Sequence, residues 1–433
     1  MRSQLRTAAI IVLYLSPMAP AVFGQGVQRY TLEDALQRAP KANFDLLLSA
    51  EQIETSVQAQ RRARADLLPQ VTADASQTRS QNYFNFGSGT SVATVNSFSA
   101  LLRARLSIFD FNTHSDYRVA KFNTEIARLE LDQTAEDIRQ AIAQLFFDHQ
   151  RNLRQAAAIR SQIERDQTLF DIASRRLEAG SATQLDATRA EVRLAASELS
   201  LIQLETQIFQ SETNFKRALD LDFDRPLELA AVDLDMSALL DFDYGRFERV
   251  LQSRPEVVTE TRRLERNRLA KKAADYQWLP SVELSGAYGR AADVFDDPFE
   301  EIWSVGVTVS VPIFEGFRLD ANQAEAASAV RGQTIALASI EKQIEAEYRV
   351  AINQVATAVK SIALARRQVT LAELELELAQ NRFEEGVANN SEVVEAQASL
   401  ATAEDGLVAA EYQYQLTRLA LARAEGDVLS LVR

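Results

Sequence analysis

The sequence predicts a mainly α-helical protein with a small β part, built from two copies of one unit. Helix breakers are scarce, with 14 glycines and 9 prolines among 433 residues. A helical period runs over residues 112–178 without proline or glycine, which predicts a rod about 100 Å long at about 1.5 Å per residue. Four short stretches alternate apolar and polar residues with a period of two, as strands do. The whole order of elements occurs twice, which indicates an internal duplication.

The first structural repeat is predicted over residues 25–229 and begins with two helices. Thr31 is placed to cap a short helix, and Asp34 stands three residues later, as in a capping box. A longer helix is expected from about 43 to 66. It ends before Pro69, because the residue that precedes a proline is pushed out of the helical region.

A β-hairpin and a long helical hairpin complete this repeat. The β-hairpin is expected over about 69–110, as two strands of about ten residues or slightly more. A polar loop over residues 80–97, rich in Asn, Ser, Gly and Thr, is expected to join them. The helical hairpin is expected over about 112–219, with a tight turn at 180–183.

The second structural repeat is predicted over residues 246–433, after an acidic, irregular segment at 220–245. Its elements follow the same order as in the first repeat. A β-hairpin is expected over about 280–314 and a long helical hairpin over about 317–425, with its turn at 386–390.

The long helix of the second hairpin carries a heptad seam in which large residues alternate with alanine. A seam of this kind keeps one face toward a partner helix and lets the two backbones approach closely. In the first long helix, His149, Asn152 and Asp166 interrupt the matching seam, and we interpret His149 as a packed polar residue. The seam of the second hairpin consists of Ile344, Tyr348, Ala351, Val355, Ala358, Ile362, Ala365, Val369, Ala372, Leu376, Ala379 and Phe383.

Composition and motifs exclude several functions. With 61 acidic and 47 basic residues, the chain lacks the positive charge with which proteins neutralise nucleic-acid phosphates. It has no cysteine, so disulfides and thiolate chemistry are excluded. His114 and His149 are far apart in the sequence and form no metal-binding motif. We therefore expect no catalytic site, no metal site and no cofactor, and predict that the protein is not an enzyme.

Residues 1–24 have the features of a signal peptide. Arg2 and Arg6 give a charged start, 8–15 form an apolar run, and small residues precede Gln25. The apolar run is too short to cross a bilayer. The sequence therefore predicts export into a bacterial cell envelope.

The four predicted strands leave two structural alternatives open. Four strands cannot close into a barrel, and an open sheet edge in lipid would leave backbone groups unpaired. Either the strands form a sheet in water, or several chains combine them into one closed barrel. Alternating apolar and polar residues, with aromatic residues at Tyr288, Trp303 and Phe314, favour the shared barrel. Three chains would supply twelve strands.

The chain resembles the TolC-like outer-membrane efflux factors over essentially all of the predicted mature sequence. The resemblance rests on the duplicated order of elements, on Pro312–Gly316 at the entry to the second long helix, and on Arg176, Gly180 and Asp186 at the first hairpin turn. It implies a homotrimer whose strands form a twelve-stranded β-barrel in outer-membrane lipid and whose helices form a hollow α-barrel across the periplasm. Residues 220–245 and the C-terminal end would form an equatorial belt.

The resemblance also implies a function as a passive exit duct of a tripartite efflux or type I secretion system. The tips of the helical hairpins would dock a periplasmic adaptor (membrane fusion) protein, which is itself joined to an inner-membrane pump of the RND, ABC or MFS type. The substrate would be determined by that pump and not by the duct. The docking residues that the resemblance implies are Gly180, Ser181, Ala182, Thr183, Gly386, Val387, Ala388, Asn389 and Asn390.

Two acidic residues are candidates for the periplasmic entrance of the duct. Family members narrow this entrance with acidic residues before the second tip, where this chain has Glu377, and the matching position in the first repeat is Asp171. A ring of carboxylates would favour cations, but ordinary solvated charge explains Glu377 equally well. The chain departs from the family pattern at Gln380, Phe383 and Asn389–Asn390, which leaves the identity of the adaptor open.

A soluble periplasmic coiled-coil scaffold or adaptor is the alternative function. Adaptors of that class carry small lipoyl-like β-domains between the two halves of a helical hairpin. No segment of this sequence has such a pattern, so the exit duct is the favoured interpretation.

Overall fold

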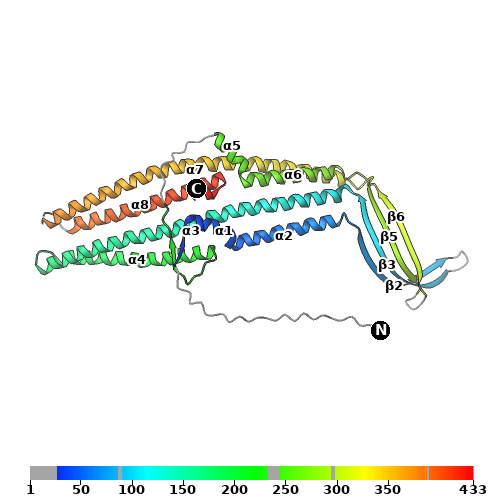
Figure 1. The fold of residues 1–433 in the computed structure, drawn as a ribbon, viewed down its shortest axis with the longest axis horizontal. Helices are drawn as coiled ribbons and strands as arrows, with labels where there is room; N and C mark the ends of the chain where they lie inside the picture. Colours follow the sequence, from blue (N-terminus) through cyan, green and yellow to red (C-terminus); the bar gives the residue numbers. More distant parts are fainter. Residues whose placement is uncertain are drawn as a thin grey trace, which may run out of the picture.

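The computed structural model describes residues 27–85, 90–232, 244–293, 298–385, 387 and 390–432. The predicted signal peptide, 1–24, lies outside the described residues. Long helices lie side by side along most of the molecule, a β-sheet lies at one end, and the turns of the helical hairpins lie at the other (Figure 1).

The first helices begin and end where local sequence signals place them. Thr31 and Asp34 form a capping box at the start of α1 (Leu32–Ala42), with Thr31 Oγ1 accepting from the Asp34 amide at 3.1 Å. Asn43 caps α2 (Phe44–Ala65) by accepting from the Asp45 amide at 2.9 Å. α2 ends just before Leu68 and Pro69, as predicted.

The duplicated helical hairpins are confirmed. The first consists of α3 (Phe111–Glu178) and α4 (Gln184–Ala218), and the second of α7 (Arg318–Glu384) and α8 (Asn390–Glu425). α3 has 68 residues and α7 has 67, and neither helix is broken. Toward the tips, the four helices lie in the order α7, α8, α3, α4 (Figure 1). Toward the sheet, α6 (Pro255–Asp275) packs between α3 and α7, and α2 packs against α3.

The alanine seam of α7 is buried along its whole length, as its heptad period predicts. Only Val369 is half-buried, and every other seam residue from Ile344 to Phe383 is buried. Facing it on α8 are Val393, Ala396 and Leu400, which are also buried. Because alanine occupies every second seam position, the two backbones of the hairpin pack closely.

Polar residues occupy part of the seam in the first hairpin, where their side chains form hydrogen bonds with α4. His149 Nδ1 lies 2.9 Å from Ser211 Oγ of α4, and burial lowers the pKa of this histidine. Ser197 Oγ donates to Asp166 Oδ2 at 2.5 Å. His149 is therefore a packed polar residue, as predicted, because its ring is buried and has a hydrogen-bond partner on α4.

The four main strands form one antiparallel sheet in the order β2 (Gln70–Asn85), β3 (Thr90–Phe109), β5 (Ser281–Ala292) and β6 (Glu300–Ser310). The predicted lengths of the first two strands and the predicted loop at 80–97 are wrong. β2 has 16 residues and β3 has 20, and they pair through most of that segment. Strands pair through hydrogen bonds between backbone groups, so a stretch with polar side chains can also form a strand. A hydrophobic pattern alone does not reveal such a stretch.

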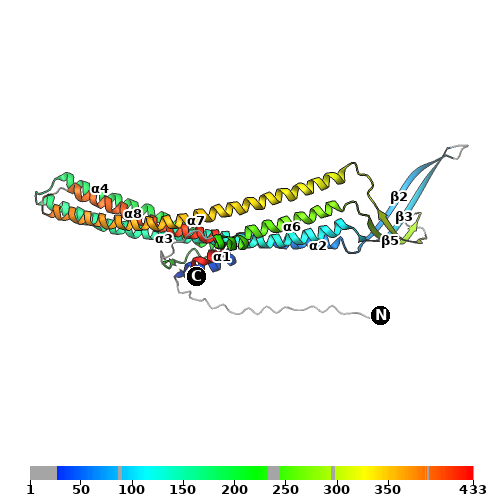
Figure 2. The ribbon, with the colours of Figure 1, turned by 90° about the horizontal axis from the view of Figure 1, so that it is seen from above.

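A smaller assembly lies at the middle of the helices. β1 (Gln28–Tyr30) pairs in parallel with β4 (Leu227–Leu229), and the 3-10 helix η1 (Val428–Val432) packs against α8, α1 and α3. α1 and the C-terminal end lie together on one side of the helical layer (Figure 2). Between β4 and α5 (Tyr244–Ser253), residues 233–243 of the predicted equatorial segment lie outside the described residues.

Among the residues that the structure describes, none of the helices combines the length and hydrophobicity that crossing a bilayer requires.

Candidate functional site

The sheet has one apolar and one polar face. Leu102, Tyr288 and Trp303 are cross-strand partners and lie on the same face, where Trp303 is 73% exposed. Along β6, Val305, Val307 and Val309 continue this exposed apolar face. The opposite face carries mainly charged, hydroxyl and small side chains, with Leu101 and Ile302 as apolar exceptions. The Oγ atoms of Ser76 and Ser99 lie 3.1 Å apart there. A sheet of this kind is suited to contact lipid on one side and water on the other.

The two edges of this sheet are open within the described part of the chain. β2 pairs only with β3, and β6 pairs only with β5. Unpaired edge groups are costly in lipid. In lipid, edges of this kind would require a further strand on each side.

The first hairpin tip is a tight turn with a capped second helix. Gly180 follows the end of α3 with φ +74°, a conformation that favours glycine. Thr183 caps α4 in a capping box with Asp186, and the hydrogen bond from the Thr183 side chain lowers the pKa of the Asp186 carboxyl. Of the predicted docking residues here, Gly180, Ser181 and Thr183 are exposed and Ala182 is half-buried.

The second hairpin tip lies at the same end of the molecule (Figure 1). Val387 is exposed there. Gly386, Ala388 and Asn389 lie outside the described residues. Asn390, at the start of α8, is only 2% exposed, and its Nδ2 donates to the Asp186 carbonyl of the first hairpin at 3.1 Å.

A second contact holds the two tips together. Nη1 of Arg176 donates to the Phe383 carbonyl at 3.1 Å, and the guanidinium carbon lies 4.1 Å from the centroid of the Phe383 ring. Arg176 and Asn390 therefore join the two tips into one surface. The sequence alone did not suggest this, because a hydrogen bond between distant positions leaves no local pattern.

The two predicted entrance acids lie at one level near the tips. Asp171 and Glu377 are both exposed, and Asp171 accepts from Gln167 Nε2 at 2.9 Å. Neighbours of both acids, Leu169 on α3 and Leu376 on α7, belong to one buried cluster. Each repeat thus places one of the two predicted acids near the tips, where Glu375 of α7 and Glu395 of α8 also lie.

The two outermost helices near the tips carry exposed apolar stripes. On both helices the stripe residues recur mainly at heptad spacing, as in a coiled-coil seam, although they face outward. α4 and α7 lie at opposite edges of the helical layer (Figure 1). The stripe residues are Leu185, Val192, Leu199, Ile202 and Phe209 on α4, and Val350, Leu364, Leu371, Leu374 and Leu378 on α7.

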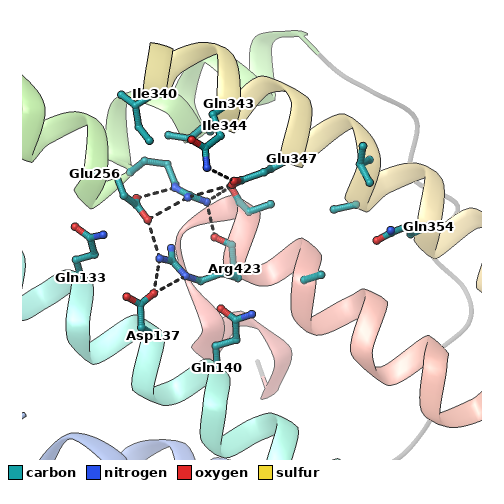
Figure 3. A pocket seen from close by; sticks show the side chains of 15 residues that line it. Gln133, Asp137, Gln140, Glu256, Ile340, Gln343, Ile344, Glu347, Gln354 and Arg423 are labelled. Atoms are coloured by element: carbon teal, nitrogen blue, oxygen red, sulfur yellow. Dashed lines mark hydrogen bonds and ion pairs between the residues drawn. The ribbon is translucent and has the colours of Figure 1, made fainter. Parts of the chain in front are cut away.

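A buried charge cluster joins α3, α6, α7 and α8 at the middle of the molecule (Figure 3). Arg254, which directly precedes α6, is 4% exposed. Its Nη1 donates to the carbonyls of Arg423 and Ala424 at 2.6 and 2.9 Å, and its Nε donates to Glu256 at 2.9 Å. The Arg423 side chain donates to Glu256 at 2.7 Å and to Asp137 of α3 at 2.6 Å.

This cluster connects the end of α8 to the start of α6. The last carbonyls of a helix have no partner within it, and here the Arg254 guanidinium binds two of them. Burial would raise the pKa of Glu256, but Arg254, a backbone hydrogen bond and Arg423 outweigh burial and lower it. The cluster lines a cavity of about 530 Å³. Sequence reasoning missed this cluster, and the only local signal was an arginine followed by a proline at a helix start.

Within the described ranges, no three His, Cys, Asp or Glu side chains gather where they could share a metal ion.

Known proteins similar to this chain are outer-membrane proteins. The family model described as "Outer membrane efflux protein" matches residues 34–220 and 247–427. Outer membrane protein OprJ of Pseudomonas aeruginosa is 25% identical over 319 residues, covering 71% of this chain and 64% of the relative. Pyoverdine export outer membrane protein OpmQ of the same organism is 23% identical, covering 67% and 63%. The match thus spans less than two thirds of the length of each of these relatives.

Solved structures with the same fold extend the comparison over nearly the whole chain. A membrane protein from Pseudomonas aeruginosa superposes with a TM-score of 0.81 at 21% identity, covering 91% of this chain and 93% of that one. The CmeC outer membrane channel of Campylobacter jejuni superposes with a TM-score of 0.80 at 18% identity, covering 91% and 85%. Since the family model matches most of both repeats, the chain belongs to the outer membrane efflux protein family.

Proposed function

We propose that this protein is the outer-membrane channel of a tripartite efflux or type I secretion system. The sheet with one apolar and one polar face is the observation that carries this proposal. If the apolar face meets lipid, the polar face lines a water-filled pore. The channel is passive and not an enzyme, and it lies in the outer membrane, as both relatives do by name.

Three copies close the channel in this proposal. The free edge of β6 in one copy pairs with the free edge of β2 in the next, which yields twelve strands. The apolar stripe on α4 packs against the stripe on α7 of a neighbour in the same way, and this contact closes the helical wall. Open edges and apolar stripes on both sides of the chain support a ring of copies, since an interface that repeats head to tail generates a closed ring.

The hairpin tips dock a periplasmic adaptor, which connects the channel to an inner-membrane pump. The Arg176 and Asn390 contacts support this assignment, because they hold both tips in one surface from which Ser181 and Val387 project. Asp171 and Glu377 narrow the entrance beside this surface. Three copies would place six carboxylates there and favour cations.

The alternative, a soluble periplasmic scaffold or adaptor, is disfavoured. In a soluble protein, Trp303, Val305 and the other residues of the apolar sheet face would lie in water. A contiguous exposed apolar surface of this kind marks contact with a protein or a membrane.

Extraction and bilayer recording test the channel itself. We expect the protein to leave the membrane fraction only with detergent, to run as a trimer, and to produce ion conductance when added to a planar bilayer. A water-soluble monomer that gives no conductance would contradict the proposal.

Site-specific cross-linking tests the two interfaces separately. A photoreactive residue at Val387 should capture an adaptor protein in the native host, identified by mass spectrometry. The same residue at Leu199, on the apolar stripe of α4, should capture another copy of this chain and serves as the matched control. Capture of only further copies from position 387 would contradict adaptor docking at the tip.

A further inference from the structure

The polar face of the sheet carries two ion pairs, each between neighbouring strands. Nη1 of Arg103 on β3 lies 3.5 Å from Asp74 Oδ2 on β2. Nε of Arg105, also on β3, lies 3.2 Å from Glu283 Oε1 on β5. One strand thus supplies both cations, and its two neighbours each supply one anion.

The strand register places all four side chains on the same face. Arg103 and Arg105 are two residues apart on β3, so they point to the same side. Arg103 pairs in register with Thr72 of β2, two residues from Asp74, and Arg105 pairs with Ser285 of β5, two residues from Glu283. This side is opposite to that of Leu102, Tyr288 and Trp303.

These ion pairs contribute little to folding. The four side chains are between 46% and 69% exposed. Exposed pairs of this kind typically contribute about 0–1 kcal/mol, because water screens the charges. Their placement on the polar face therefore calls for a different explanation.

We propose that Arg103, Arg105, Asp74 and Glu283 set the ion preference of the outer part of the pore. This inference rests on the proposed function, in which the polar face lines the channel. Within these pairs two cations balance two anions in each chain, so in three chains the pairs form a belt without net charge around the lumen. Glu300 of β6, in register with Ala291, lies on the same face outside these pairs. Rings of charged side chains control which ions pass a pore, and a balanced belt passes solutes of either sign.

Charge-neutralising variants shift this balance in opposite directions. Asp74→Asn with Glu283→Gln leaves the arginines without their paired acids, and we expect the ratio of K⁺ to Cl⁻ permeability to fall. Arg103→Gln with Arg105→Gln leaves the acids, and we expect cation selectivity. Reversal potentials in planar bilayers under a KCl gradient measure the ratio of K⁺ to Cl⁻ permeability, which should change by about twofold or more in each direction.

Arginines on the other face of the same sheet supply the matched control. Arg290 is in register with Ala100, and Arg79 with Asn96, which places both on the side of Leu102. Arg79→Gln and Arg290→Gln remove the same charge but should leave the permeability ratio unchanged. Equal ratios in the wild type and both lumen double variants would overturn the inference while the channel function stands. Failure of the wild-type trimer to conduct would instead contradict the proposed function.

Discussion

Replacing Arg254 with alanine is expected to lower the free energy of unfolding by about 3–5 kcal/mol, as removal of one partner from a buried ion pair does. The variant removes one of the two arginine charges beside the buried Glu256 carboxylate. It also removes the hydrogen-bond donor of the Arg423 and Ala424 carbonyls at the end of α8. Chemical denaturation of the detergent-solubilised protein, followed by circular dichroism, measures the effect. Arg254→Lys should recover little of this lost stability, because the lysine ammonium lacks the planar arrangement of N–H donors of a guanidinium.

Arg262→Ala, on the helix that Arg254 precedes, is the control for this variant. Arg262 forms an exposed ion pair with Glu265 at 2.6 Å, and removal of such a pair should change stability by about 0–1 kcal/mol. Equal losses for the two alanine variants would show that the buried cluster does not join α8 to α6 as the contacts indicate.

Replacing Gly289 with alanine is expected to prevent assembly of the proposed trimeric barrel. A Cβ at this position would overlap the Ala100 carbonyl oxygen and would lie 2.8 Å from the Leu101 Cα. Both neighbours are backbone atoms of β3, so the strand pair must shift, at a cost beyond the about 1–3 kcal/mol of ordinary overpacking. The yield of detergent-resistant trimer on gel electrophoresis measures the loss.

Gly286→Ala on the same strand is the matched control. A Cβ there would meet the Ser304 carbonyl oxygen at 3.7 Å and Val305 Cγ2 at 4.0 Å, which are ordinary contacts. This variant should assemble as the wild type does. Trimer yields that do not differ between the two variants would contradict a close approach of β3 and β5 at Gly289.

Features with a local sequence signal could be predicted from the sequence. The capping box at Thr31, the end of α2 before Pro69 and the buried seam from Ile344 to Phe383 each depend on residues close together in the chain. Such signals act within a few residues and persist in the folded protein. The length of β2 and β3 could not be predicted in the same way, because their polar ends are held by backbone pairing and not by a hydrophobic pattern.

The candidate site was only partly predictable. The turn at Gly180 follows from its sequence, and the structure places Ser181 and Val387 on an exposed tip. The contact of Arg176 with Phe383 and that of Asn390 with Asp186 join residues about 200 positions apart. Local patterns carry no information about such pairs.

The sequence by itself determined the kind of element over most of the chain, the duplication, and the alternation of apolar and polar residues along the strands. Only the tertiary structure decided which side chains meet across the elements. It brings Arg254 to the end of α8, sets Arg103 and Arg105 beside acids of two different strands, and turns Asn390 inward. Periodicity specifies which face of a helix or strand is buried, whereas pairing between faces depends on how the chain packs in three dimensions.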